Sequence, residues 1–139
     1  MLKQLQLLDE ATQRLRQDKN VLAIFVGGSV AKGTVHALSD IDLVVIVKKR
    51  AEYVRYYAGT IDIEVDAKTL AELPRFLQLY PDMWYAYSEL KPVWDTKNLF
   101  PKFTAILHRF QKQYTTAPRL QGDLFVILNH YQLKIASAV

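Results

Sequence analysis

The sequence contains no cysteine among its 139 residues. Disulfide bonds, zinc sites built on thiolates and cysteine nucleophiles are therefore excluded. Any metal ion in this protein must be held mainly by oxygen ligands, the donors preferred by hard cations such as Mg²⁺.

Long apolar runs and a strong charge of either sign are also lacking. No stretch reaches the roughly 20 apolar residues that span a bilayer, and charged residues interrupt the first 17 residues too often for a signal peptide. We therefore expect a soluble, cytoplasmic protein with no membrane partner. The net charge of +4 suits an anionic ligand without demanding nucleic acid, so we do not expect a nucleic-acid partner.

The apolar content is high, at 50% of residues with 12% aromatic, which predicts a folded chain with a real core. Leucines at helical spacing predict an amphipathic helix at the start of the chain. Apolar runs at residues 21–26 and 40–47 predict two strands. The second run is apolar on both of its faces beyond the aspartates, which predicts a sheet covered on both sides.

Two short motifs border these strands. Gly27, Gly28 and Ser29 follow the first strand, and Asp40 and Asp42 lie at the start of the second. Aspartates two positions apart on a strand point the same way, with α-carbons roughly 6 to 7 Å apart. Such a pair can grip a divalent cation, and a glycine turn with a hydroxyl can hold phosphate oxygens. Either motif alone is common in ordinary turns and strand ends, and only their combination favours a functional site.

A third strand is predicted at residues 60–67, where apolar and acidic residues alternate strictly. The alternation places three acidic side chains on one face: Asp62, Glu64 and Asp66. One further carboxylate beside the first pair would complete a two-metal site for phosphoryl or nucleotidyl transfer. The same pattern also fits the solvated face of an edge strand, and the residues alone leave open which acid is used.

The segment GGSVAKGTVHALSDIDLVV resembles the signature of the nucleotidyltransferase superfamily related to DNA polymerase beta. That signature has Gly-Ser, a spacer of about ten residues, Asp-x-Asp inside a strand, and an acidic residue on a later strand. The resemblance implies an α/β polymerase-beta-like fold: a small mixed β-sheet with flanking helices, followed by C-terminal helices. We expect a catalytic domain over residues 1–100 and C-terminal helices over residues 101–139.

The resemblance also implies an enzyme activity. A nucleoside monophosphate would pass from a Mg²⁺-bound NTP, with ATP as the expected donor, to an acceptor hydroxyl, and pyrophosphate would be released. Two Mg²⁺ ions would be held by Asp40, Asp42 and Asp62. Glu64 is the alternative third carboxylate or base.

By position, the resemblance assigns Gly28 and Ser29 to the β and γ phosphates. Lys32 stands where many small members of the superfamily carry arginine, and it corresponds to a triphosphate contact. Lysine keeps the charge of that arginine but lacks its two-pronged fork.

The acceptor is implied less directly. Segments near Asp62 and Trp94 are similar to those of antibiotic nucleotidyltransferases, which implies a small hydroxylated acceptor such as an aminoglycoside-like antibiotic. A helix predicted from about Pro118 is apolar on nearly every side, so we expect a homo-oligomer or a helical protein partner, or else that this chain is the front part of a longer protein with a helical bundle. The alternative function is a minimal nucleotidyltransferase antitoxin that binds and modifies a helical toxin. A catalytically silent nucleotide-binding domain is the third candidate.

Overall fold

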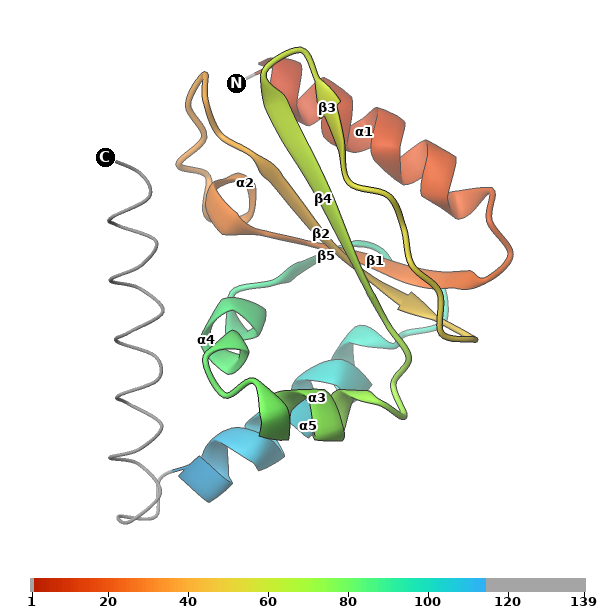
Figure 1. Cartoon of the computed structure of the whole chain (residues 1–139), viewed down its shortest axis with the longest axis vertical. Helices are drawn as coiled ribbons and strands as arrows, with labels where there is room; N and C mark the ends of the chain where they lie inside the picture. Colours follow the sequence, from red (N-terminus) through yellow and green to blue (C-terminus); the bar gives the residue numbers. More distant parts are fainter. Residues whose placement is uncertain (1, 115–139) are drawn as a thin grey trace.

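Figure 1 shows the computed structural model of the chain, which describes residues 2–114. The helix predicted from about Pro118 lies outside the described residues, so its proposed partner surface stays a prediction. The division of the chain near residue 100 also stays a prediction, and helix α5 (Phe100–Tyr114) begins there.

Five strands form one mixed sheet in the order β3-β4-β2-β1-β5. β1 is antiparallel to β2 and β5, β4 is antiparallel to β3, and the central pair β2 and β4 is parallel. The strand bounds are β1 Val21–Gly27, β2 Ile41–Val47, β3 Tyr56–Ala58, β4 Ile61–Lys68 and β5 Lys91–Trp94. The predicted α/β fold with a small mixed sheet is therefore confirmed.

Helices cover both faces of this sheet (Figure 1). Buried Ala11 and Leu15 of α1 pack with the odd-numbered residues of β2 on one face. Phe103 and Leu107 of α5 pack with Val44 and the other even-numbered apolar residue of β2 on the opposite face. The helix bounds are α1 Leu2–Arg16, α2 Gly28–Lys32, α3 Leu73–Leu79, α4 Met83–Ser88 and α5 Phe100–Tyr114. Across residues 2–114, no helix combines the length and apolar character needed to cross a membrane.

Two segments contain elements that the sequence pattern did not predict. The polar connection after β2 includes the edge strand β3, which has only three residues and is not fully buried at any of them. The aromatic segment at residues 80–95 forms α4 and β5. Neither a three-residue strand nor a six-residue helix is long enough for its periodicity to stand out from its neighbours.

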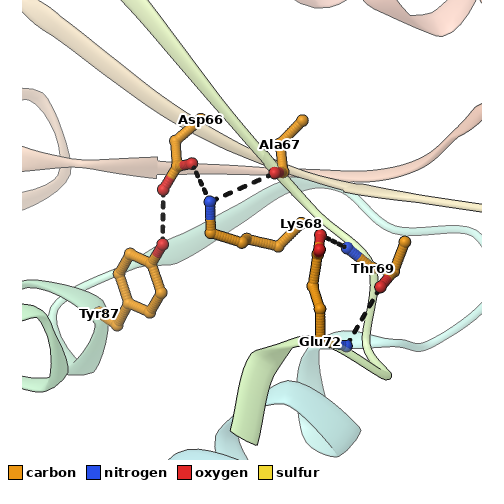
Figure 2. Close-up of polar contacts among 6 residues, drawn as sticks. All are labelled: Asp66, Ala67, Lys68, Thr69, Glu72 and Tyr87. Atoms are coloured by element: carbon orange, nitrogen blue, oxygen red, sulfur yellow. Dashed lines mark hydrogen bonds and ion pairs between the residues drawn. The ribbon is translucent and has the colours of Figure 1, made fainter. Parts of the chain in front are cut away.

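Helix α3 is preceded by a turn that Thr69 and Glu72 close. Thr69 and Glu72 do exchange hydrogen bonds, from the Thr69 N–H to Glu72 Oε1 at 2.7 Å and from the Glu72 N–H to Thr69 Oγ1 at 3.2 Å (Figure 2). These bonds close a turn, and α3 begins at Leu73. Pro74 then lies in the first helical turn, where a missing N–H costs no hydrogen bond.

Candidate active site

The glycine turn and the aspartate pair meet at one end of the central strands. Gly27, the last residue of β1, is the antiparallel partner of Asp42 in β2. Gly28 has φ +62°, and a Cβ at this position would lie 2.7 Å from Asp42 Oδ2. Both the backbone conformation and the close carboxylate therefore require glycine here. Two motifs that are separate in the sequence form one site.

Asp40 and Asp42 are both exposed, but they occupy different kinds of backbone. Asp42 lies within β2, whereas Asp40 lies one residue before the strand begins. Their neighbours Ile41 and Leu43 are fully buried on the face that α1 covers. Because side chains alternate along a strand, Asp42 lies on the opposite face, at the uncovered end of the row that continues with Val44.

A buried glutamine that the sequence analysis missed holds the loop leading to Asp40. Gln4 of α1 is 1% exposed, and its amide Nε2 donates to the carbonyl oxygens of His36 at 2.9 Å and Ala37 at 3.3 Å. Within the loop, the Ser39 hydroxyl accepts from the His36 N–H at 2.8 Å. The detectable signal was a polar residue at helical spacing from apolar Leu8, Ala11 and Leu15, since such a residue faces the core.

Glu64 lies directly beside Asp42 on the neighbouring strand. The two residues are partners in the parallel ladder between β2 and β4. Adjacent strands are separated by about 4.8 Å, so the two carboxylates leave the sheet side by side. Glu64 is exposed. Of the three acidic residues on β4, Glu64 is the one that pairs in register with Asp42.

Asp62 is held by an arginine that the sequence analysis did not single out. Arg55 Nε donates to Asp62 Oδ1 at 2.8 Å, and Arg55 Nη2 donates to Asp62 Oδ2. The Asp62 side chain is only 10% exposed, whereas that of Arg55 is 56% exposed. Hydrogen bonding and the negative charge of Asp62 raise the pKa of Arg55 further above its already high value.

Asp66 is held by two neighbouring side chains, those of Tyr87 and Lys68 (Figure 2). The Tyr87 hydroxyl donates to Asp66 Oδ2 at 2.5 Å, and Lys68 Nζ donates to Asp66 Oδ1 at 2.7 Å. Burial, with the charge of Asp66 second, raises the pKa of Tyr87 well above its usual value, so the hydroxyl keeps its proton and donates. Asp66 therefore connects β4 to α4.

The comparison with known families agrees with this geometry. The model of the nucleotidyltransferase domain family matches residues 8–107 of the chain. This chain belongs to the nucleotidyltransferase domain family. The resemblance found in the sequence is thereby confirmed.

Eight chains of solved structures also match this nucleotidyltransferase domain. One is described as "Crystal structure of the toxin-antitoxin with AMP-PNP", with 16% identity, a TM-score of 0.50, and coverage of 89% of this chain and 97% of that chain. At this identity the similarity concerns the fold alone. No curated protein matches.

Lys32, the predicted triphosphate contact of the nucleotidyltransferase domain, forms an ion pair. Its Nζ lies 2.8 Å from Glu89 Oε2, just after α4. Half of the Lys32 side chain is exposed. A partly exposed pair of this kind is weak, so the lysine can exchange Glu89 for another anion at little cost.

The donor atoms of the site are of the chemical type that hard divalent cations prefer. Asp40, Asp42 and Glu64 offer exposed carboxylate oxygens, and the turn at Gly28 leaves room for Asp42 beside it. In the part of the chain that the structure describes, no three acidic or histidine side chains lie close enough together to hold an ion as one group. The site therefore has the ligands but not the assembled arrangement.

Proposed function

We propose that this nucleotidyltransferase domain transfers a nucleoside monophosphate from a Mg²⁺-bound NTP to an acceptor hydroxyl. The observation that supports this proposal is the contact geometry of Gly28 and Asp42, because it joins the phosphate-binding motif to the metal-binding motif. ATP is the proposed donor. The similar solved structure contains AMP-PNP, an analogue of ATP.

Each residue of the site has a proposed role. Asp40 and Asp42 would hold two Mg²⁺ ions with Asp62, the favoured third carboxylate, or with Glu64. When bound, Mg²⁺ would lower the pKa of the acceptor hydroxyl and neutralise the leaving pyrophosphate. Whichever of the two β4 acids serves as base takes the hydroxyl proton.

The proposed transfer requires no reactant besides the NTP and the acceptor. The acceptor oxygen forms a bond to the α-phosphorus of the NTP, and the bond from that phosphorus to the bridging oxygen breaks. Gly28 and Ser29 would hold the β and γ phosphates, which leave together as pyrophosphate. Lys32 would exchange Glu89 for the triphosphate.

The acceptor is proposed to be a small hydroxylated molecule such as an aminoglycoside-like antibiotic. The alternative acceptor is a hydroxyl on a helical protein partner, and the toxin-antitoxin description of the similar structure is what favours keeping it. ATP labelled at the α-phosphate distinguishes the two. Label transferred to an antibiotic supports the first acceptor, and label on a co-purifying protein supports the second.

The metal assignment is tested by Asp42→Asn. We expect the loss of transfer activity to be roughly a thousandfold or more, since a metal ligand contributes several kcal/mol to the transition state. Thermal unfolding should stay unchanged, because removing a charge from an acidic site does not destabilise the metal-free protein. Asp9→Asn, at an exposed position of α1, is the matched control and should keep full activity. An Asp42→Asn variant that keeps its activity would contradict the assignment.

Nucleotide binding is measured separately by thermal unfolding with ATP, GTP, CTP and UTP, with and without Mg²⁺. A nucleotide at a hundred times its Kd stabilises the fold by about 2.7 kcal/mol, which raises the Tm by several degrees. We expect a Mg²⁺-dependent rise that the double variant Asp40→Asn, Asp42→Asn loses. A rise that survives in the double variant would place the nucleotide elsewhere.

A further inference from the structure

Arg55 and Asp62 form an ion pair whose two members differ in their freedom to move. Asp62 lies in β4, which has a strand on each side, and its side chain is almost buried. Arg55 lies in the segment that precedes the three-residue edge strand β3, with more than half of its side chain exposed. If the pair opens, the arginine can move into solvent, whereas the backbone of Asp62 stays fixed in the sheet.

The arginine occupies both oxygen atoms of Asp62. Its two nitrogen donors each contact a different oxygen, which is the strong, two-pronged form of this interaction. Arg55 also lies within the electrostatic influence of Glu64, the residue in register with Asp42. The guanidinium is thus a positive charge beside Asp62 and Glu64 that is present before any metal ion arrives.

A divalent cation on Asp62 would compete with this guanidinium. Both carry positive charge, both bind carboxylate oxygen, and two cations at one carboxylate repel each other. The cation must therefore either displace the arginine or bind less tightly while the arginine remains. The exposure of Arg55 favours displacement, because an exposed arginine regains its hydration when it leaves.

We propose that Arg55 is a positioning residue that holds Asp62 away from the metal ions until Mg²⁺ and nucleotide bind. This proposal rests on the proposed function, since it takes Asp62 as the third carboxylate. In the empty protein, Arg55 neutralises Asp62. On loading, the guanidinium leaves Asp62 and the carboxylate turns to the metal ions beside Asp42.

The test is the affinity of the metal-free protein for Mn²⁺ without nucleotide, measured by electron paramagnetic resonance. Arg55→Gln removes the competing charge and should bind Mn²⁺ roughly five- to tenfold more tightly than wild type. Arg55→Lys keeps the charge but not the fork, and it should show a smaller gain. It also serves as the second variant if Arg55→Gln fails to fold. Arg109→Gln, an exposed arginine of α5, is the control for net charge and should leave the affinity unchanged.

A second pair of variants separates the ion pair from a general charge effect. In an Asp62→Asn background, Arg55→Gln should no longer tighten Mn²⁺ binding, because the carboxylate for which the two cations compete has lost its charge. Equal affinity of Arg55→Gln and Arg109→Gln, or weaker binding by Arg55→Gln, would overturn the proposal.

Asp42→Asn distinguishes this failure from failure of the proposed function. If Mn²⁺ binding depends on Asp42 but Arg55→Gln does not tighten it, only the role of Arg55 is wrong. If Mn²⁺ binding is absent or does not depend on Asp42, the metal site of the proposed function is wrong, and the role of Arg55 falls with it.

Discussion

The two halves of β4 carry acidic residues on the same face but in different surroundings. In the first half, Glu64 is exposed and Asp62 contacts an exposed arginine. In the second half, Asp66 accepts from Tyr87 and from Lys68, whose Nζ lies 4.3 Å from the centre of the Phe76 ring. Alternation along the strand sets the face for all three acids. The helices α3 and α4 cover only the second half of that face, and their contacts commit Asp66 to packing.

The contact at Gly28 gives the largest expected effect on the exposed half. Gly28→Ala would place a methyl group 2.7 Å from Asp42 Oδ2, and we expect roughly tenfold or weaker binding of Mn²⁺ and ATP because the carboxylate must move. Gly33→Ala is the matched control, with φ +73° and nothing within 4 Å of its added Cβ. Both changes should cost about 1 to 2 kcal/mol of stability through left-handed backbone strain. Equal binding by the two variants would contradict the role of the contact.

The loop before Asp40 should depend on Gln4. Gln4→Ala leaves the His36 and Ala37 carbonyl oxygens without their buried donor, and we expect it to lower the free energy of unfolding by about 2 to 3 kcal/mol. Urea unfolding measures this loss. Gln6→Ala on the exposed side of the same helix should change stability by less than about 0.5 kcal/mol. If the two variants are equally stable, the buried amide does not hold the loop.

A change at Tyr87, in the packed half of β4, should lower the stability of the fold without affecting metal binding. Tyr87→Phe removes the donor to Asp66, and we expect a loss of about 1 to 2 kcal/mol with unchanged Mn²⁺ binding. A change in Mn²⁺ affinity would mean that the two halves are coupled.

The raised pKa of Tyr87 predicts that the stability of the fold decreases at alkaline pH. Its pKa in the folded protein is raised, so the unfolded chain releases this proton first, near pH 10. The stabilisation is therefore complete below about pH 10 and falls as the pH rises above that value. Tyr87→Phe should lack this part of the loss, which unfolding curves at neutral and alkaline pH can measure.

The smallest expected effect concerns the ion pair of Lys32 and Glu89 at the edge of the site. Glu89→Gln should change stability by less than about 1 kcal/mol, because the pair is partly exposed. If Lys32 contacts the triphosphate, the same change should tighten ATP binding slightly and lower its dependence on salt. Unchanged ATP affinity would remove Lys32 from the proposed nucleotide contacts.

Much of the fold was predictable from local patterns. The apolar runs of β1 and β2 and the strict alternation of β4 are long enough to identify their strands and the faces that they bury. The short elements β3 and α4 were not predictable, because their positions depend on the neighbours that they pack against, and β5 was implied only by the similarity of the segment around Trp94 to a strand-and-helix segment of antibiotic nucleotidyltransferases. The family was implied by the resemblance of the segment GGSVAKGTVHALSDIDLVV to the nucleotidyltransferase signature.

The sequence by itself therefore determined the family, the central strands and the face of β4 that carries its acids. The acidic face of β4 could be predicted because side-chain direction in a strand follows from backbone geometry alone. Only the tertiary structure decided what each acid contacts. Arg55 reaches Asp62 across a turn of the chain, Tyr87 approaches Asp66 from a later helix, and Gln4 meets a loop 32 residues away. The contacts of Tyr87 and Gln4 depend on packing between distant segments, and that of Arg55 depends on how the chain turns to pair β3 with β4.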